Sequence, residues 1–308
     1  MRTTLTHPTR RLATVLLIVL AACDAGGTTD GGGAVTDGVV KATDEGGTTV
    51  RLERPARRVL SLVPSGTDLL VALGATEQIV GRTRYDDAPE VQRLPSVGGG
   101  LDPGLEALAA LRPDLVLAWE LTPGAGTRGR IEALGIPTFA LQTPDTGTLF
   151  RTVERVGHLT GRDSSAAALA ARLRAELDSV RRMADAAPRR SVFYVVSTSP
   201  AMTAGPDTFI GQLVSLAGGD NVFPEAGAGW PTVSLEEVVR RDPDLIVLPV
   251  GEDPTNSLAA LRAKPGWREI PAVREGRVVT VPADVVNRPG PRVGEAARML
   301  YEAMRGER

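Results

Sequence analysis

The side chains that most often carry enzyme chemistry are scarce in this chain. Of its 308 residues, one is a cysteine, Cys23, and two are histidines, His7 and His158. A zinc site needs several Cys, His or carboxylate ligands grouped together, and a catalytic triad needs a histidine beside its nucleophile. The sequence contains neither a phosphate-binding glycine loop nor a nucleophile elbow. We therefore expect no catalytic residue, no metal site and no cofactor, and we interpret the protein as a binding protein rather than an enzyme.

Cys23 lies in a setting that predicts lipid attachment. Residues 1–22 contain three arginines and no acidic residue, and their apolar run, 12–20 (LATVLLIVL), is too short to span a bilayer. A cysteine directly after Leu20-Ala21-Ala22 resembles a bacterial lipobox, which implies cleavage before Cys23 and lipidation of its sulfur. The alternative is a plain signal peptide. Because Cys23 is the only cysteine, the chain can form no internal disulfide.

The segment after the cysteine is rich in Gly, Thr and Asp and shows no apolar period. We expect residues 1–22 to be a lipoprotein signal peptide and residues 23–37 a flexible tether. A tether behind a lipidated cysteine would hold the folded part in the cell envelope, at the outer face of a membrane.

The charge balance argues against a nucleic-acid partner. Without the three arginines of the first 22 residues, 32 basic residues stand against 37 acidic ones. No basic patch of the kind that neutralises phosphates is present.

One long helix is predicted from Arg162 to Ala187, with Asp163 or Ser164 as its N-cap and a proline just past its end. Asp178 and Arg182 are spaced for an ion pair on its surface. At 1.5 Å per residue the helix would be about 36 Å long. Its apolar stripe consists of Leu169, Leu173, Leu177 and Val180.

On both sides of this helix, short apolar segments alternate with helical ones, which is typical of parallel sheets covered on both faces. The expected strands are 58–63, 79–81, 115–119, 137–141, 191–196, 245–248 and 278–281, preceded by a hairpin over 39–52. The other expected helices are 68–73, 105–111, 128–134, 146–159, 209–217, 235–240, 257–262 and 294–304. Thr67 is the expected N-cap of the first of these, after a turn at Pro64-Ser65-Gly66.

The two halves contain an internal repeat. The sequence EALAALRPDLVL begins at Glu106, EEVVRRDPDLIVL begins at Glu236, and Pro113-Asp114-Leu115 recurs as Pro243-Asp244-Leu245 at the same offset of 130 residues. Each unit is expected to be a helix, a tight Pro-Asp turn and a strand. The predicted fold class is therefore α/β, with two Rossmann-like lobes joined by a single long backbone helix and a cleft between the lobes.

The predicted boundaries are an N-terminal lobe at 38–160, a connecting helix at 161–188 and a C-terminal lobe at 189–308. Five stretches in this order resemble the class III periplasmic binding proteins of ABC importers, which carry cobalamin, ferric siderophores or haem. The stretches are RVLSLVPSGTDLLVALG (58–74), TRYDDAPE (83–90), LEALAALRPDLVLAW (105–119), GWPTVSLEEVVRRDPDLIVL (229–248) and ADVVNRPGPR (283–292). The resemblance implies a largely preformed cleft with little hinge motion.

Within the family the chain is most similar to the cobalamin-binding members, which line their cleft with aromatic and a few polar side chains. A corrin ring is a broad plane with amide arms, so flat aromatic surfaces suit it. Two positions depart from the pattern: glycines in the loop from Ser96 to Gly100 replace one aromatic residue, and Met202 replaces another. The resemblance implies ligand contacts for Tyr85, Trp119, Trp230, Asp284, Arg288 and Met202.

Glu106 and Glu236 match the acidic residues, one on each lobe, with which the family docks on arginines of its permease. The resemblance thus implies three partners: an ABC permease with its ATPase, a small-molecule ligand, and a membrane reached through the lipid anchor. We expect the protein to be a monomer.

Simpler interpretations remain for these residues. The cleft aromatics could be core residues, Asp284 and Arg288 could pair with each other, and Glu106 and Glu236 could be solvated helix residues. Trp267 is expected to be structural. The ligand could also be a ferric siderophore or haem, in which case Arg288 would neutralise an anionic group.

Overall fold

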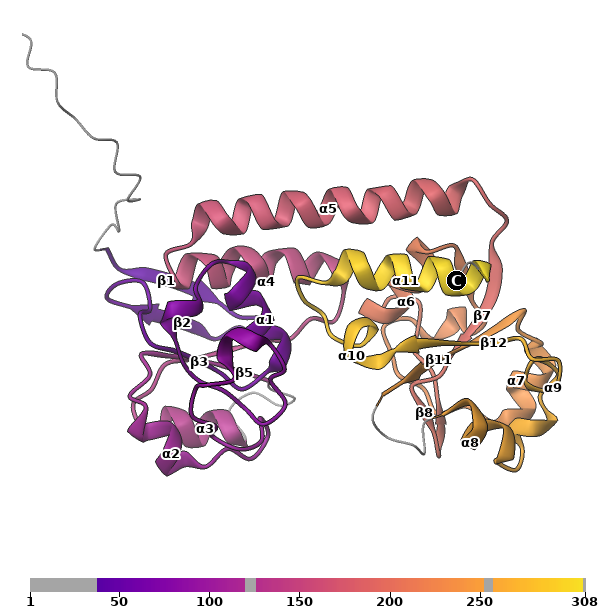
Figure 1. Cartoon of the computed structure of the whole chain (residues 1–308), viewed down its shortest axis with the longest axis horizontal. Helices are drawn as coiled ribbons and strands as arrows, with labels where there is room; N and C mark the ends of the chain where they lie inside the picture. The colour runs from indigo at the N-terminus through magenta and orange to yellow at the C-terminus, as the bar shows by residue number, and fades with distance from the viewer. Residues whose placement is uncertain (1–37, 120–125, 252–256, 307–308) are drawn as a thin grey trace, which may run out of the picture. The chain divides into compact units, whose positions relative to one another are not determined.

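The computed structural model describes residues 38–119, 126–251 and 257–306 (Figure 1). The predictions for the signal peptide, the tether and Cys23 lie outside the described residues. No helix in the described ranges is both long and apolar enough to cross a membrane.

The N-terminal lobe contains a four-stranded parallel sheet in the order β4-β3-β5-β6. Its central strands are buried on both faces, which explains their continuous apolar sequence. The strands are β3 (Val59–Ser61), β4 (Ile79–Gly81), β5 (Leu115–Ala118) and β6 (Thr138–Ala140). The helices of this lobe are α1 (Pro64–Ala72), α2 (Leu105–Ala110), α3 (Thr127–Glu132) and α4 (Thr146–Leu159), with η1 (Thr76–Gln78) and η2 (Pro89–Val91).

Helix α1 begins earlier than predicted. Pro64 is its first residue, and Val63, in extended conformation, occupies the N-cap position. The predicted turn at residues 64–66 is therefore the first turn of the helix, and Thr67 is buried within it instead of capping it. Proline suits this place because its fixed φ matches a helix and its missing N–H would be unpaired there anyway.

The C-terminal lobe repeats the parallel sheet in the order β10-β7-β11-β12. The strands are β7 (Arg190–Tyr194), β10 (Gly219–Asn221), β11 (Leu245–Val250) and β12 (Val278–Pro282), with a small hairpin of β8 (Ser197–Thr198) and β9 (Ala201–Met202). The helices are α6 (Phe209–Leu216), α7 (Leu235–Arg241), α8 (Leu258–Ala263), α9 (Pro271–Arg274), α10 (Ala283–Val286) and α11 (Val293–Arg305), with η3 (Pro224–Ala226) and η4 (Trp267–Glu269). Strand β10 was not predicted, because Gly-Asp-Asn has no strand-like pattern.

The repeat found in the sequence is also a repeat of structure. Among the described non-glycine residues, positive φ occurs at Arg112 and Asp242, which are 130 residues apart and end α2 and α7. Asp114 accepts hydrogen bonds from the backbone at the start of β3, and Asp244 accepts them from Ser191 N and Oγ at the start of β7. These bonds lower the pKa of Asp244. Each aspartate lies directly before one strand and thus holds the start of the neighbouring strand in the same sheet.

Helix α5 (Asp163–Asp185) runs alongside α4 at one lobe and α11 at the other (Figure 1). Glycines allow these close contacts: a Cβ on Gly157 of α4 would lie 2.4 Å from the Cβ of Ala166. Two details were predicted wrongly. Arg162 occupies the N-cap position without a side-chain cap, and Asp178 pairs with Arg181, at 3.6 Å, where Arg182 had been expected.

One continuous apolar core runs from the N-terminal hairpin through α4 and α5 to α11. It includes Val40 of the hairpin, Leu169 and Leu173 of α5, and Leu300 of α11. Smaller cores lie under the other face of each sheet. The stripe predicted for the long helix is therefore confirmed as the part of the core that joins the lobes.

The N-terminal hairpin, β1 (Val40–Thr43) and β2 (Thr49–Leu52), is attached by a buried ion pair. Arg128 Nη1 lies 2.9 Å from Asp44 Oδ2, and their side chains are 3% and 0% exposed. Asp44 also accepts hydrogen bonds from the backbone N–H groups of Thr48 and Ala140, and Arg128 also pairs with Glu132 at 2.7 Å. The carboxylate is thus fully enclosed by donors.

Candidate functional site

A cavity of about 430 Å³ lies between the two lobes. Trp119 follows β5 directly and Leu141 follows β6, so the N-terminal side of the cavity lies at the carboxyl ends of the strands, where open α/β sheets bind ligands. The lining residues are Val63, Pro64, Ser65, Trp119, Leu141, Thr143, Phe209, Ile210, Trp230, Asn287, Arg288 and Pro289.

A second hollow of about 380 Å³ adjoins the first and shares Val63, Pro64 and Trp119 with it. Its other lining residues are Leu62, Arg84, Tyr85, Gly99, Gly100, Leu101 and Asp102. This hollow lies at Gly99 and Gly100, in the loop where the resemblance predicted the loss of an aromatic residue. Gly100 is required here because a Cβ would lie 2.1 Å from the carbonyl oxygen of Leu62.

Three large aromatic side chains are exposed around these hollows. The exposed fractions are 58% for Tyr85, 42% for Trp119 and 46% for Trp230. The interpretation that they are core residues is therefore wrong. Trp267, in contrast, is 1% exposed and donates its indole N–H to Thr198 O at 3.1 Å, which confirms its structural role.

The backbone on both sides of Trp230 is hydrogen-bonded to the segment 203–205. Gly229 O and Pro231 O accept hydrogen bonds from Gly205 N and Thr203 N, at 2.9 and 3.2 Å. These contacts fix the backbone, so the indole ring is presented from a rigid support.

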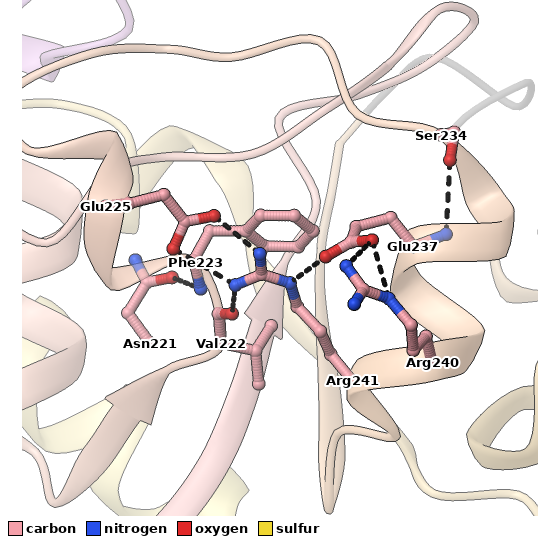
Figure 2. Close-up of polar contacts among 8 residues, drawn as sticks. All are labelled: Asn221, Val222, Phe223, Glu225, Ser234, Glu237, Arg240 and Arg241. Carbon is pink, nitrogen blue, oxygen red and sulfur yellow. Dashed lines mark hydrogen bonds and ion pairs between the residues drawn. The ribbon is translucent and has the colours of Figure 1, made fainter.

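The earlier part of the same segment is attached to α7 through Arg241 (Figure 2). The guanidinium of Arg241 donates hydrogen bonds to Glu225, Glu237 and the carbonyl oxygen of Val222. It also lies over the ring of Phe223, 4.1 Å from the ring centroid. The pKa of Arg241 is raised by its hydrogen bonds to Glu225 and Glu237. The loop before Trp230 and the helix after it are thus connected by one side chain.

Arg288 lines the cavity, but it pairs with Asp87 and not with Asp284. Asp284 is exposed in the first turn of α10, and Met202 is half-buried in β9. Neither Asp284 nor Met202 is among the residues that line the two hollows. Their ligand contacts stay predictions.

The structure adds cavity residues that the sequence did not indicate. Phe209 and Ile210 begin α6, where Thr208 caps the helix by accepting from Gly211 N. Asn287 accepts a 2.7 Å hydrogen bond from Tyr194 Oη, whose pKa is raised by burial. Asn287 could have been found from its place beside Arg288, whereas the apolar start of α6 looks like an ordinary core helix.

The two candidate docking carboxylates occupy equivalent places. Glu106 and Glu236 are each the second residue of a short helix, and both are exposed. Within 38–119, 126–251 and 257–306, neither has an ion-pair partner. The neighbouring Glu237 accepts from Arg240 and Arg241, bonds that lower its pKa (Figure 2). Of the two adjacent carboxylates Glu236 and Glu237, Glu236 is therefore the one that is available to a partner.

No group of three or more His, Cys, Asp or Glu side chains suited to a metal ion occurs in the described part of the chain. Two parallel α/β lobes on one long helix, with a ligand-sized cavity between them, define a two-lobe substrate receptor. Residues 59–285 match the family described as periplasmic binding protein, and the chain belongs to that family. The predicted fold class and the resemblance to class III binding proteins are thereby confirmed.

Three known proteins illustrate this relationship. The chain is 30% identical over 251 residues to the vitamin B12-binding protein of Yersinia pestis, covering 81% of this chain and 86% of that protein. It is 29% identical over 273 residues to an uncharacterized ABC transporter substrate-binding lipoprotein, YvrC, of Bacillus subtilis, covering 86% and 85%. A possible iron-binding periplasmic solute-binding protein from Staphylococcus epidermidis matches with a TM-score of 0.72 and 28% identity, covering 82% of this chain and 99% of that one.

Proposed function

We propose that the protein is the substrate-binding lipoprotein of an ABC importer and captures cobalamin or a related corrinoid between its lobes. The observation that carries the proposal is the group of exposed rings, Tyr85, Trp119 and Trp230, around two adjoining hollows. Broad, partly apolar rings bind well to such surfaces, and a few polar groups fix their orientation. The relationship to a vitamin B12-binding protein supports this ligand class.

A second candidate ligand is an iron chelate or haem. The likeness to a possible iron-binding protein supports it, and so do two guanidinium groups, Arg84 and Arg288, in the lining of the hollows. Arg84 could neutralise an anionic ligand directly, and Arg288 could do so after release from Asp87.

Calorimetric titration of the purified protein with cyanocobalamin, haemin and several ferric siderophores tests the proposal. We expect one saturable site for cyanocobalamin with a micromolar or lower Kd, and chromatography of the released ligand should recover it unmodified. Absence of corrinoid binding at micromolar concentration would refute the first ligand, and conversion to a product would contradict a pure binding role.

The anchor and the partner belong to the same proposal. Lipidation of Cys23 would hold the protein at the membrane, and Glu106 and Glu236 would dock it on the permease. Mass spectrometry of the N-terminal peptide tests the first point. An acylated Cys23 is expected, and a free thiol in the mature protein would contradict it.

A further inference from the structure

An ion pair joins the two lobes at the cavity. Arg288 Nη1 lies 3.1 Å from both carboxylate oxygens of Asp87, 201 residues away in the sequence. The side chain of Arg288 is 27% exposed and that of Asp87 is 59% exposed. Arg288 lines the cavity. Its positive charge, which would otherwise face the ligand, is already paired with a carboxylate of the opposite lobe.

Asp87 is held in place by its neighbour. The Asp86 side chain is 4% exposed and accepts hydrogen bonds from the N–H and the hydroxyl of Thr83, the latter at 2.8 Å. The carbonyl oxygen of Asp86 also accepts from Gln92 Nε2 at 2.8 Å. The backbone that carries Asp87 is therefore fixed.

The Arg288 side of the contact also touches the other lobe. A Cβ on Gly290 would lie 3.4 Å from the Cβ of Ser65, so this segment passes close to the start of α1. Asp68, in the same helix, has its pKa raised mainly by desolvation and also by the negative charge of Asp87. The N-terminal lobe thus supplies the carboxylate of this contact and the C-terminal lobe supplies the guanidinium.

We infer that Asp87 is a specificity-determining residue that favours uncharged ligands over anionic ones. This inference rests on the proposed function. An anionic group that approaches Arg288 has to displace the Asp87 carboxylate and then remains close to it, and like charges within a few Å repel. A ligand whose polar groups are amides can bind without breaking the pair.

Two probes of different charge test the inference: cyanocobalamin, which has no net charge, and haemin, which carries two propionates. Asp87→Asn should raise the affinity for haemin at least five-fold at low salt and change that for cyanocobalamin less than two-fold. The gain should shrink as salt is added, because exposed charges are screened, and it should be absent in the Arg288→Gln background. Asp220→Asn, which makes the same charge change on β10, is the matched control. Unchanged haemin affinity in Asp87→Asn would overturn the inference.

A measurement without ligand separates this inference from the proposed function. Urea unfolding of the wild type, the two single variants and the double variant should give non-additive midpoints, because each single variant already breaks the pair. If the wild type binds neither probe, the ligand proposal fails. The cycle reports on the ion pair alone: a coupling shows that Asp87 and Arg288 interact, as the inference requires, and additive midpoints overturn the inference.

Discussion

Replacing Trp230 by alanine should weaken ligand binding by an amount that the structure allows us to work out. A tryptophan can bury up to about 250 Å², and Trp230 is 46% exposed, so a ligand can cover at most about 115 Å² of it. At about 25 cal/mol per Å², the upper bound is about 3 kcal/mol. Because the ligand covers part of this face and alanine keeps some contact, we expect a loss of about 1–3 kcal/mol, or roughly 5- to 150-fold in Kd.

Isothermal titration calorimetry is the suitable assay, because the substitution would itself change the fluorescence of the protein. Trp230→Phe should give an intermediate Kd since it keeps a flat ring. Leu134→Ala is the matched control: Leu134 is 48% exposed and does not line either hollow. A Kd for Trp230→Ala within two-fold of the wild type, with unchanged thermal unfolding, would refute the assignment of Trp230 as a ligand contact.

Three further predictions concern stability, docking and pH. Arg128→Met should lower the free energy of unfolding in urea by about 3–5 kcal/mol, because it leaves the buried carboxylate of Asp44 unpaired. Glu106→Ala combined with Glu236→Ala should leave the ligand Kd unchanged while reducing transport in cells. Asp68→Asn should stabilise the protein at pH 7, because burial raises the pKa of Asp68 above its ordinary 3.8 and so disfavours its ionised form. Below pH 3.8 the Asp68 carboxyl is protonated in both the folded and the unfolded protein, so it does not destabilise the fold there. The destabilisation appears as the pH rises through the raised pKa, and the stability gained by Asp68→Asn should therefore disappear in acid.

Each of these predictions has a control or a contradicting outcome. A loss below 1 kcal/mol for Arg128→Met would contradict the enclosed ion pair. Glu237→Ala is the control for docking, since that carboxylate is engaged by arginines, and normal transport by the double variant would count against the docking assignment. A stabilisation by Asp68→Asn that is independent of pH would show that its cause is not the carboxyl charge.

The strands and the long helix could be predicted because each has a local pattern. The central strands are apolar throughout, and α5 carries one apolar stripe. The Pro-Asp-Leu repeat also predicted the equivalence of Glu106 and Glu236. Such patterns arise wherever burial on a regular element dictates the residue types.

The remaining features have no local pattern. Strand β10 consists of Gly-Asp-Asn and exists because β7 offers it an edge to pair with. The contact between Arg288 and Asp87 spans 201 residues, and the sequence suggested Asp284, four positions away, as the partner. Whether an exposed aromatic residue faces a cavity or the core likewise depends on how distant segments pack, as Trp230 and Trp267 illustrate.

The continuous core through α5 means that neither lobe has a complete hydrophobic interior of its own. Heating should therefore unfold both lobes together, in a single cooperative calorimetric transition instead of two. Either lobe expressed alone would expose the apolar face that normally packs against the helix. The two candidate docking carboxylates and the two walls of the cavity should consequently unfold together. A permease would then encounter either a fully folded protein or an unfolded one, and no molecule with a single folded lobe.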